Sequence, residues 1–275
     1  MLEQLKTDCG FPEMFKKFEE EYRAKIANGM TPTQIKEELD KNEVENYNNK
    51  KGALKYVDCK ICNNKGEIAI LEDGEIKYRP CTCIKLRYAY QLIEEQGLAD
   101  SVERLTFHNY TVSDKWQEEV KDKALRYSQS ALNEWFAVFG QSGSGKTHIC
   151  TAIVGELMRR GVPVVYMPYA EDMQILIADY YEKDIYLADI CNIKYCECLY
   201  IDDFMKNYKE NSNEAKIVFE IIDFRYKNKL ATIISSEITL SALMGIDIAI
   251  AGRIKERCDN YLANIKPDLT KNKRF

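Results

Sequence analysis

The chain has 275 residues, of which 45% are hydrophobic and 30% charged, a composition typical of globular proteins. This length excludes a mini-protein and accommodates one large domain with a small appendage. Lysine and arginine number 39 against 44 aspartates and glutamates, a formal net charge of −5, which excludes a protein that coats nucleic acid by bulk charge alone.

The sequence also bears on location and on cysteine chemistry. No apolar run approaches the length that spans a bilayer, and the charged N-terminal segment differs from the basic and then apolar start of a signal peptide. We therefore expect a cytoplasmic protein with no membrane partner. Ten cysteines in such a protein favour metal ligands or reduced, buried thiols over a disulfide framework.

The first fifty residues are predicted to be largely helical. Thr31 followed by Pro32 is typical of a helix start, with a second, short helix expected to about Leu39 and a polar linker over residues 42–51. These helices either pack on their own domain or form an arm that docks a partner. A first, amphipathic helix is indicated by apolar residues spaced three and four apart: Met14, Phe15, Phe18 and Tyr22.

Two pairs of cysteines flank a predicted β-hairpin. Its turn lies at Asp73-Gly74, and alternating apolar residues on either side form two short strands that bring the pairs together. Zinc takes four thiolates in a tetrahedron, and so small a hairpin is hard to stabilise without a metal. We therefore expect a structural zinc site, with an iron–sulfur cluster or unliganded thiols as alternatives. The four ligands would be Cys59, Cys62, Cys81 and Cys83.

The strongest motif is a complete G-x-x-x-x-G-K-[ST] pattern at residues 140–147. An apolar run over residues 135–139 precedes it as a buried strand, and a helix is expected from Thr147 to Arg160. The glycines let backbone N–H groups surround phosphates, Lys146 reaches the β- and γ-phosphates, and Thr147 binds magnesium. The predicted nucleotide-binding residues are Gly140, Gln141, Ser142, Gly143, Ser144, Gly145, Lys146 and Thr147.

A second predicted strand carries the acids that such a loop requires. The apolar segment 198–201 ends in Asp202 and Asp203. Asp202 is expected on the magnesium side, as the carboxylate that holds the metal against the phosphates. Asp203, one residue further on, is expected to face the γ-phosphate, where a carboxylate can orient and deprotonate the attacking water.

Further segments complete an α/β pattern. Strands alternating with helices form a mostly parallel sheet that is covered on both faces, and we expect five strands here. The boundary between the N-terminal module (1–100) and this domain (101–275) is placed at residue 100. The remaining strands are predicted over 163–167, 231–236 and 260–265, and helices over 113–129, 170–182 and 212–229.

Together these motifs resemble the DnaC/IstB-like branch of AAA+ ATPases, which includes bacterial and phage replicative helicase loaders. The resemblance covers roughly residues 105–265 and rests on residues 140–147, 199–203, 221–236 and 251–257. It implies an AAA+ P-loop ATPase fold that lacks a full C-terminal helical lid. Residues 59–83 resemble the cysteine-bearing N-terminal module of the Gram-positive loaders, so a small helical and zinc-ribbon-like module is expected before the ATPase domain.

The resemblance implies roles for three further residues. The pair Ser235-Ser236 lies where the family has the tip of its sensor for the γ-phosphate, which usually ends in an Asn; here Glu237 follows, and Ser236 is the predicted sensing residue. Arg257 occupies the position of the arginine finger, which acts on the ATP of a neighbouring subunit, so ATP would be hydrolysed at subunit interfaces. Arg253, one turn earlier on the same helix face, is grouped with it as a nucleotide contact. The alternative is that both arginines only solvate a helix face.

The resulting hypothesis is an ATPase that loads the replicative DNA helicase onto single-stranded DNA. Residues 1–100 would dock a hexameric helicase of the DnaB type and hold Zn²⁺, and residues 101–275 would bind ATP or ADP with Mg²⁺, self-assemble and contact single-stranded DNA weakly. Two alternatives stay open. One is a transposition ATPase of the IstB type that binds duplex DNA, and the other is a nucleotide-dependent inhibitor of a helicase or initiator.

Overall fold

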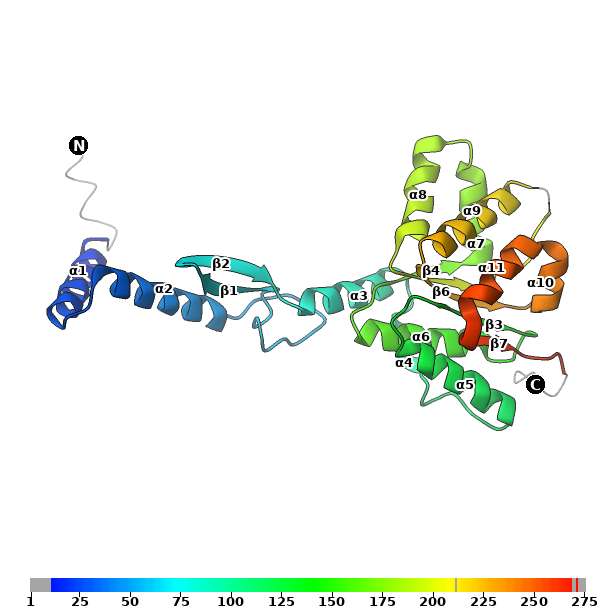
Figure 1. The fold of residues 1–275 in the computed structure, drawn as a ribbon, viewed down its shortest axis with the longest axis horizontal. Helices are drawn as coiled ribbons and strands as arrows, with labels where there is room; N and C mark the ends of the chain where they lie inside the picture. Colours follow the sequence, from blue (N-terminus) through cyan, green and yellow to red (C-terminus); the bar gives the residue numbers. More distant parts are fainter. Residues whose placement is uncertain (1–10, 211, 269–270, 272–275) are drawn as a thin grey trace. The chain divides into compact units, whose positions relative to one another are not determined.

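The computed structural model describes residues 11–210, 212–268 and 271, with side chains from residue 16 onward. Its internal contacts divide the chain into two compact units, Met1–Ile84 and Lys85–Phe275 (Figure 1). Residues 85–100, which the sequence-based boundary assigned to the N-terminal module, pack in the second unit. Within the described residues, no helix is both long enough and apolar enough to cross a bilayer.

The first unit opens with two helices. Thr31 caps the second of them as predicted, because its hydroxyl accepts the N–H of Gln34 while the Gln34 side chain accepts the N–H of Thr31. The predicted short helix and linker are wrong, since the helix continues through residues 42–49. The predicted hairpin forms around Asp73-Gly74 as an antiparallel pair. The elements are α1 (Phe11–Ala27), α2 (Pro32–Asn49), β1 (Glu67–Glu72) and β2 (Glu75–Pro80).

Contacts with the hairpin explain why the polar part of α2 beyond Leu39 is helical. The Tyr47 ring meets Tyr78 edge to face, with ring centroids 4.9 Å apart. The side-chain amide of Asn48 exchanges two hydrogen bonds of 2.9 Å with the backbone of Ala69. Periodicity along the segment gives no sign of these contacts, because they join residues that are distant in the sequence.

The second unit is built on a five-stranded sheet whose paired strands are all parallel, in the order β4-β5-β6-β3-β7. This confirms the five-stranded, mostly parallel sheet. Because parallel strands end at the same edge, the loop after β3 emerges beside the end of β6, with the end of β5 next along. The strands are β3 (Trp135–Phe139), β4 (Val164–Pro168), β5 (Cys198–Asp202), β6 (Ala231–Ser236) and β7 (Leu262–Asn264).

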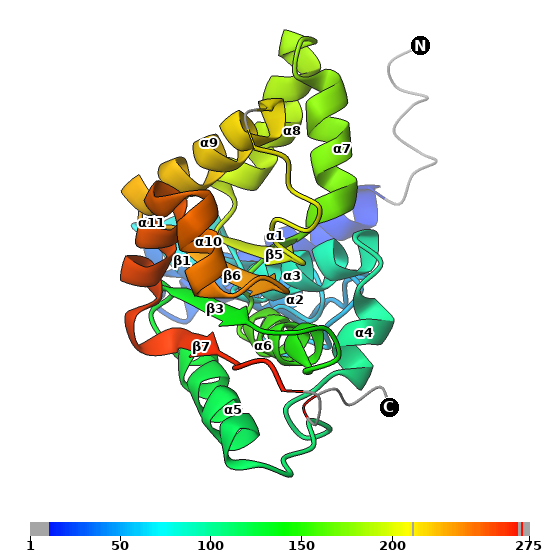
Figure 2. The same ribbon diagram turned by 90° about the vertical axis from the view of Figure 1, so that its right-hand side faces the viewer.

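Helices cover both faces of this sheet, as predicted (Figure 2). One face packs against α3 (Cys83–Glu95), α4 (Ala99–Arg104), α5 (Lys115–Ser128) and α6 (Lys146–Arg159). The helix predicted over 170–182 forms over Tyr169–Asp179, and a second helix that was not predicted follows it over Lys183–Tyr195. The other face packs against α7 (Tyr169–Asp179), α8 (Lys183–Tyr195), α9 (Asn213–Lys227), α10 (Leu240–Ile246) and α11 (Ile248–Cys258).

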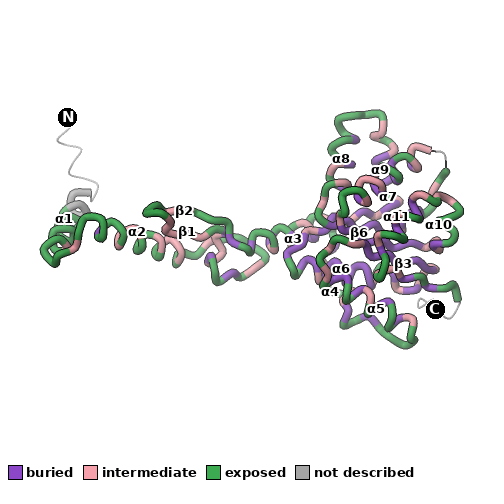
Figure 3. Tube along the Cα trace, viewed as in Figure 1, coloured by how far each residue is buried: buried purple, intermediate pink, exposed green. Residues whose placement is uncertain are grey.

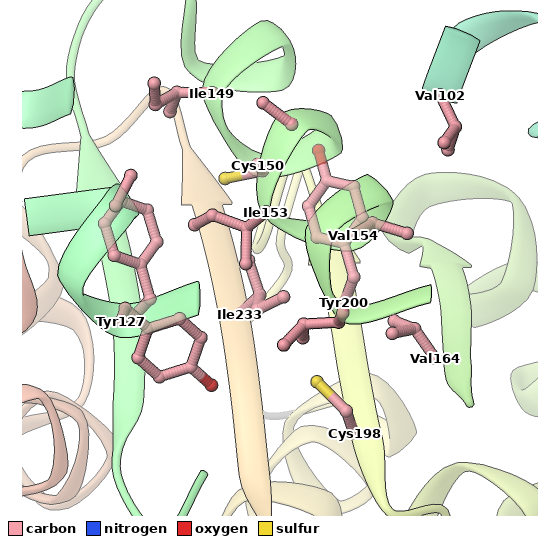
Figure 4. Packing of buried hydrophobic residues seen from close by; sticks show 14 of the residues in the cluster. Val102, Tyr127, Ile149, Cys150, Ile153, Val154, Val164, Cys198, Tyr200 and Ile233 are labelled. Carbon is pink, nitrogen blue, oxygen red and sulfur yellow. The ribbon is translucent and has the colours of Figure 1, made fainter. Parts of the chain in front are cut away.

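The strands of this sheet are buried on both sides, so they read as continuous apolar runs. In β3, Phe136 and Val138 enter one core while their neighbours enter the other, and every residue of the strand is buried (Figure 3). Figure 4 shows one of these cores, where Ile153 of α6 lies over the sheet next to Ile233 and Ile149 lies one helical turn away. The strand before the glycine-rich loop and the helix after it are therefore fixed by apolar packing.

A fully buried arginine joins α9 to the end of α8. The guanidinium of Arg225 donates to the backbone oxygens of Ile193, Lys194 and Cys196, at 2.9, 3.1 and 3.2 Å, and to the Thr232 hydroxyl at 3.0 Å. The oxygens at a helix C-terminus carry partial negative charge. This end of α8 therefore solvates the cation in place of water.

Arg225→Met should destabilise the second unit by about 3 kcal/mol or more, because buried backbone oxygens lose their donor while the apolar stem stays. The expected drop in melting temperature is roughly 6–12 °C for a unit of this size. Both tryptophans of the chain, Trp116 and Trp135, lie in this unit, so tryptophan fluorescence reports its unfolding. Lys227→Met removes an exposed partner of Asp223, which keeps its ion pair with Arg253, and should cost under about 1 kcal/mol. Equal losses in both variants would contradict the prediction.

Candidate functional site

The glycine-rich loop lies between β3 and α6, at the edge of the sheet where the strands end. Gly143 and Gly145 have φ of 77° and 81°, a left-handed conformation that side chains rarely adopt. A Cβ on Gly145 would also lie 3.2 Å from the Tyr110 ring. Gly145 is the N-cap of α6, so the positive end of that helix faces the loop and favours an anion there.

Lys146 is 5% exposed and folds back over the loop. Its Nζ donates to the Gln141 carbonyl oxygen at 2.9 Å, and the Ser144 hydroxyl donates to the same oxygen at 2.8 Å. Burial lowers the pKa of Lys146, while nearby carboxylates, led by Glu237, oppose that shift. The buried ammonium of Lys146 thus has acidic side chains near it, and its hydrogen-bond partner is the neutral carbonyl oxygen of Gln141.

Asp202, at the end of β5, comes next to the first turn of α6. Its Oδ1 lies 3.4 Å from the Thr147 hydroxyl and accepts a hydrogen bond from the Ser235 hydroxyl. The Tyr166 hydroxyl is 3.4 Å from its other carboxylate oxygen. The structure therefore brings together the two residues predicted to bind magnesium, one hydroxyl and one carboxylate, which are oxygen ligands of the type that Mg²⁺ prefers.

Asp203 and Ser236 both make contacts within the turn that follows β5, and their roles at the γ-phosphate stay predictions. The Asp203 carboxylate pairs with Lys206 at 2.7 Å. Ser236 is fully buried, and its hydroxyl donates to the Phe204 carbonyl oxygen at 2.8 Å. The serine that contacts both acids is Ser235, the other residue of the pair at the predicted sensor position. Neighbouring residues of a strand face opposite sides of the sheet. Which of the two serines contacts the acids therefore depends on how β6 pairs with β5.

The two arginines of α11 contact residues outside the loop. Arg253 donates to the Asp223 carboxylate at 2.8 and 3.1 Å and lies over the Phe219 ring. The Arg257 guanidinium donates to the Asn133 carbonyl oxygen, and its Nε is buried without a hydrogen-bond partner in the described structure. Neither contact tests a role on the ATP of a neighbouring subunit, so both assignments stay predictions.

The four cysteines of the first unit come together as predicted. All are buried, all carry free thiols, and their sulfurs lie within 4.8 Å of one another. The Sγ atoms of Cys59 and Cys81 are 3.7 Å apart, and those of Cys62 and Cys83 are 3.5 Å apart. Sulfurs about 2.3 Å from a tetrahedral zinc ion lie roughly 3.8 Å from each other. The cluster therefore fits a zinc ion and is too open for a disulfide.

Backbone groups also prepare this cluster for a metal. The Gly66 N–H donates to the Cys62 sulfur at 3.3 Å. Burial by itself would raise the pKa of the Cys62 thiol, but the Gly66 N–H and the three neighbouring sulfurs outweigh it and lower that pKa to about 6. A Cβ on Gly66 would lie 2.7 Å from the side chains of Ile84 and Leu54. Metals bind the thiolate form of cysteine, so the hydrogen bond from Gly66 and the lowered pKa of Cys62 favour the form that binds a metal.

Comparison with known proteins places the chain in a family. Residues 97–253, more than half of the chain, match the family described as IstB-like ATP binding protein. The chain belongs to this family. It is 30% identical over 222 residues to the phage-like element PBSX protein XkdC of Bacillus subtilis (strain 168), covering 76% of this chain and 82% of that protein. It is 27% identical over 142 residues to the replicative helicase loader DnaC of Escherichia coli (strain K12).

The match to DnaC covers 50% of this chain and 56% of DnaC. The crystal structure of the DnaC helicase loader superposes with a TM-score of 0.52 and 20% identity, covering 61% of this chain and all of that chain. This similarity confirms the AAA+ fold of the second unit. The DnaC/IstB-like resemblance drawn from the motifs is therefore correct at the level of family and fold.

Proposed function

We propose that the chain binds Mg-ATP at residues 140–147 and hydrolyses it. The observation that carries this proposal is the meeting of Thr147 and Asp202 at the N-terminus of α6, with Lys146 beside them. Lys146 would hold the β- and γ-phosphates, Thr147 and Asp202 would hold magnesium, and Asp203 would orient the attacking water. Magnesium, when bound, neutralises charge on the phosphates.

Hydrolysis would require assembly of several copies. Arg257 lies near the end of α11, with a half-satisfied guanidinium that can exchange its carbonyl partner for a phosphate. Supplied to the ATP of a neighbouring copy, this cation would offset the charge that develops on the γ-phosphate. Arg253 is already paired with Asp223, so we propose it as a support for the same helix face and a weaker nucleotide contact.

The proposed task of the ATPase is to load a replicative DNA helicase onto single-stranded DNA. The relationship to the loader DnaC supports this task, and so does a first unit that offers a docking surface. Helix α1 presents Phe18, Tyr22 and Ile26 at successive turns, exposed by 48, 37 and 41%. Met14 and Phe15, which the sequence placed on the same stripe, have side chains outside the described part.

Light scattering of the protein with its host's hexameric helicase tests this proposal, with and without Mg-ATP. A stoichiometric complex that transfers the helicase onto closed circular single-stranded DNA is the expected result. A complex that forms without transfer would favour an inhibitor of the helicase. Binding of duplex DNA with no helicase complex would favour a transposition ATPase of the IstB type, and either result would overturn the loader assignment.

A charge on the exposed stripe of α1 should break this complex. Phe18→Glu combined with Ile26→Glu is expected to weaken helicase binding at least about 10-fold, because it buries charge in an apolar contact. Ala24→Glu is the matched control, since at 100° per residue Ala24 lies on the opposite side of the same helix. Full binding by the double variant would remove α1 from the docking surface, and equal losses in both would indicate a general charge effect.

A further inference from the structure

Ser235 joins the two acids of the candidate ATP site. It is fully buried on β6. Its hydroxyl donates to Oδ1 of Asp202 and accepts the backbone N–H of Asp203 at 3.0 Å. Its carbonyl oxygen accepts the N–H of Phe204 at 2.8 Å. A single residue therefore contacts three consecutive positions of the chain as it leaves β5.

The turn after β5 has an unusual backbone that needs such support. Asp203, Met205 and Asn207 all have positive φ, at 53°, 58° and 60°. Residues with side chains rarely adopt this conformation, and they keep it only where surrounding contacts fix it. The hydrogen bond from the Asp203 N–H to Ser235 acts on the first of these residues, so it sets the direction in which the Asp203 side chain leaves the chain.

We infer that Ser235 is a positioning residue for both acids. This inference rests on the proposed function, because it assigns Ser235 to the same ATP site. Donation to Oδ1 fixes the Asp202 carboxylate next to the Thr147 hydroxyl, where both would meet magnesium. Acceptance from the backbone of Asp203 fixes the acid that would orient water. Residues that orient metal ligands by hydrogen bonding control both metal affinity and activity.

The neighbouring serine supplies a control of the same size. Ser236 is also fully buried on β6, and its hydroxyl likewise reaches the turn, at the Phe204 carbonyl oxygen. The hydroxyl contacts neither carboxylate, because its described hydrogen bonds go to Phe204 and Ile238. Ser235→Ala and Ser236→Ala thus remove one buried hydroxyl each from the same turn, and only the first removes a bond to an acid.

The test measures ATP affinity of the full-length chain with and without Mg²⁺, together with kcat and KM for ATP hydrolysis. Ser235→Ala should reduce the gain in affinity that Mg²⁺ provides, and kcat where hydrolysis is measurable, by about 10- to 100-fold. Its affinity for Mg-free ATP should stay within about 2-fold, because Lys146 and the loop backbone are unchanged. Ser235→Thr, which keeps the hydroxyl, should restore most of both. Ser236→Ala, at the predicted sensor, is judged on binding alone: the gain in ATP affinity that Mg²⁺ provides should stay at the wild-type value whatever the effect on kcat or on melting temperature.

Several outcomes would overturn this assignment. Wild-type Mg²⁺ dependence in Ser235→Ala would do so, as would an equal loss in Ser236→Ala. If Ser235→Ala does not fold, Ser235→Cys retains the volume with a much weaker donor and should show the same loss; normal Mg²⁺ dependence there also overturns the assignment. Failure of the wild-type chain to bind ATP at all would instead overturn the proposed function.

Discussion

Lys146→Ala should weaken ATP binding at least about 100-fold. Lys146 supplies the buried positive charge of the loop, and its Nζ is already at hydrogen-bonding distance from the loop backbone. Each hydrogen bond from a cation to a phosphate contributes about 1.5–3 kcal/mol, and 1.4 kcal/mol is a tenfold change in affinity. Removal also leaves the phosphates near Glu237, Asp203 and Asp202, whose charges act on the position of Lys146. Repulsion therefore adds to the lost attraction.

Isothermal titration with ATP and Mg²⁺ measures this loss. Lys146→Met should behave like Lys146→Ala, because it fills the space of the buried stem and removes only the charge. Lys115→Ala, at the exposed start of α5, serves as a control and should retain full affinity. If both Lys146 variants bind ATP as tightly as the wild type, residues 140–147 do not hold its phosphates.

The sequence predicted those features that depend on neighbouring residues in the chain. Strand, glycine loop and helix follow one another at residues 135–159, so their order and their phosphate-binding geometry are a local property. The cysteine cluster was predictable for a similar reason, since a two-residue turn at Asp73-Gly74 fixes the register of the hairpin and brings both pairs to its open end.

Features that depend on distant contacts were missed or misplaced. The resemblance placed the sensor at Ser235-Ser236 and favoured Ser236, but it could not show that Ser235 contacts the acids, because that contact follows from the pairing of β5 with β6. The helical extension of α2 depends on the hairpin, about twenty residues later in the chain, through Asn48 and Ala69. The spacing along α9 does not distinguish Arg225 from an exposed charge, yet Arg225 is fully buried because the end of α8 supplies its acceptors. None of these partners can be identified from spacing along the chain.

Loss of the metal should unfold the first unit while the second stays intact. Cys59→Ser is expected to reduce zinc content from about one equivalent to near zero, since a tetrahedral site with three thiolates binds far more weakly. In the described part of this unit, the buried cluster consists of the four cysteines, with only Val57 and Ile68 packed against them. So little apolar surface cannot offset the conformational entropy of the unit. Zinc binding of about 10–16 kcal/mol, as in zinc-finger peptides, can.

Metal analysis and limited proteolysis of the full chain separate the two units. Trypsin should cleave Cys59→Ser rapidly within residues 16–84, while tryptophan fluorescence, which reports the second unit alone, should show the wild-type melting temperature. Cys191→Ser is the matched control, because Cys191 lies on α8, partly exposed and outside the cluster, and it should keep both metal and protease resistance. A full equivalent of zinc in Cys59→Ser would exclude this ligand set. Visible absorption from the purified wild type would assign the four thiolates to an iron–sulfur cluster instead, because zinc is colourless.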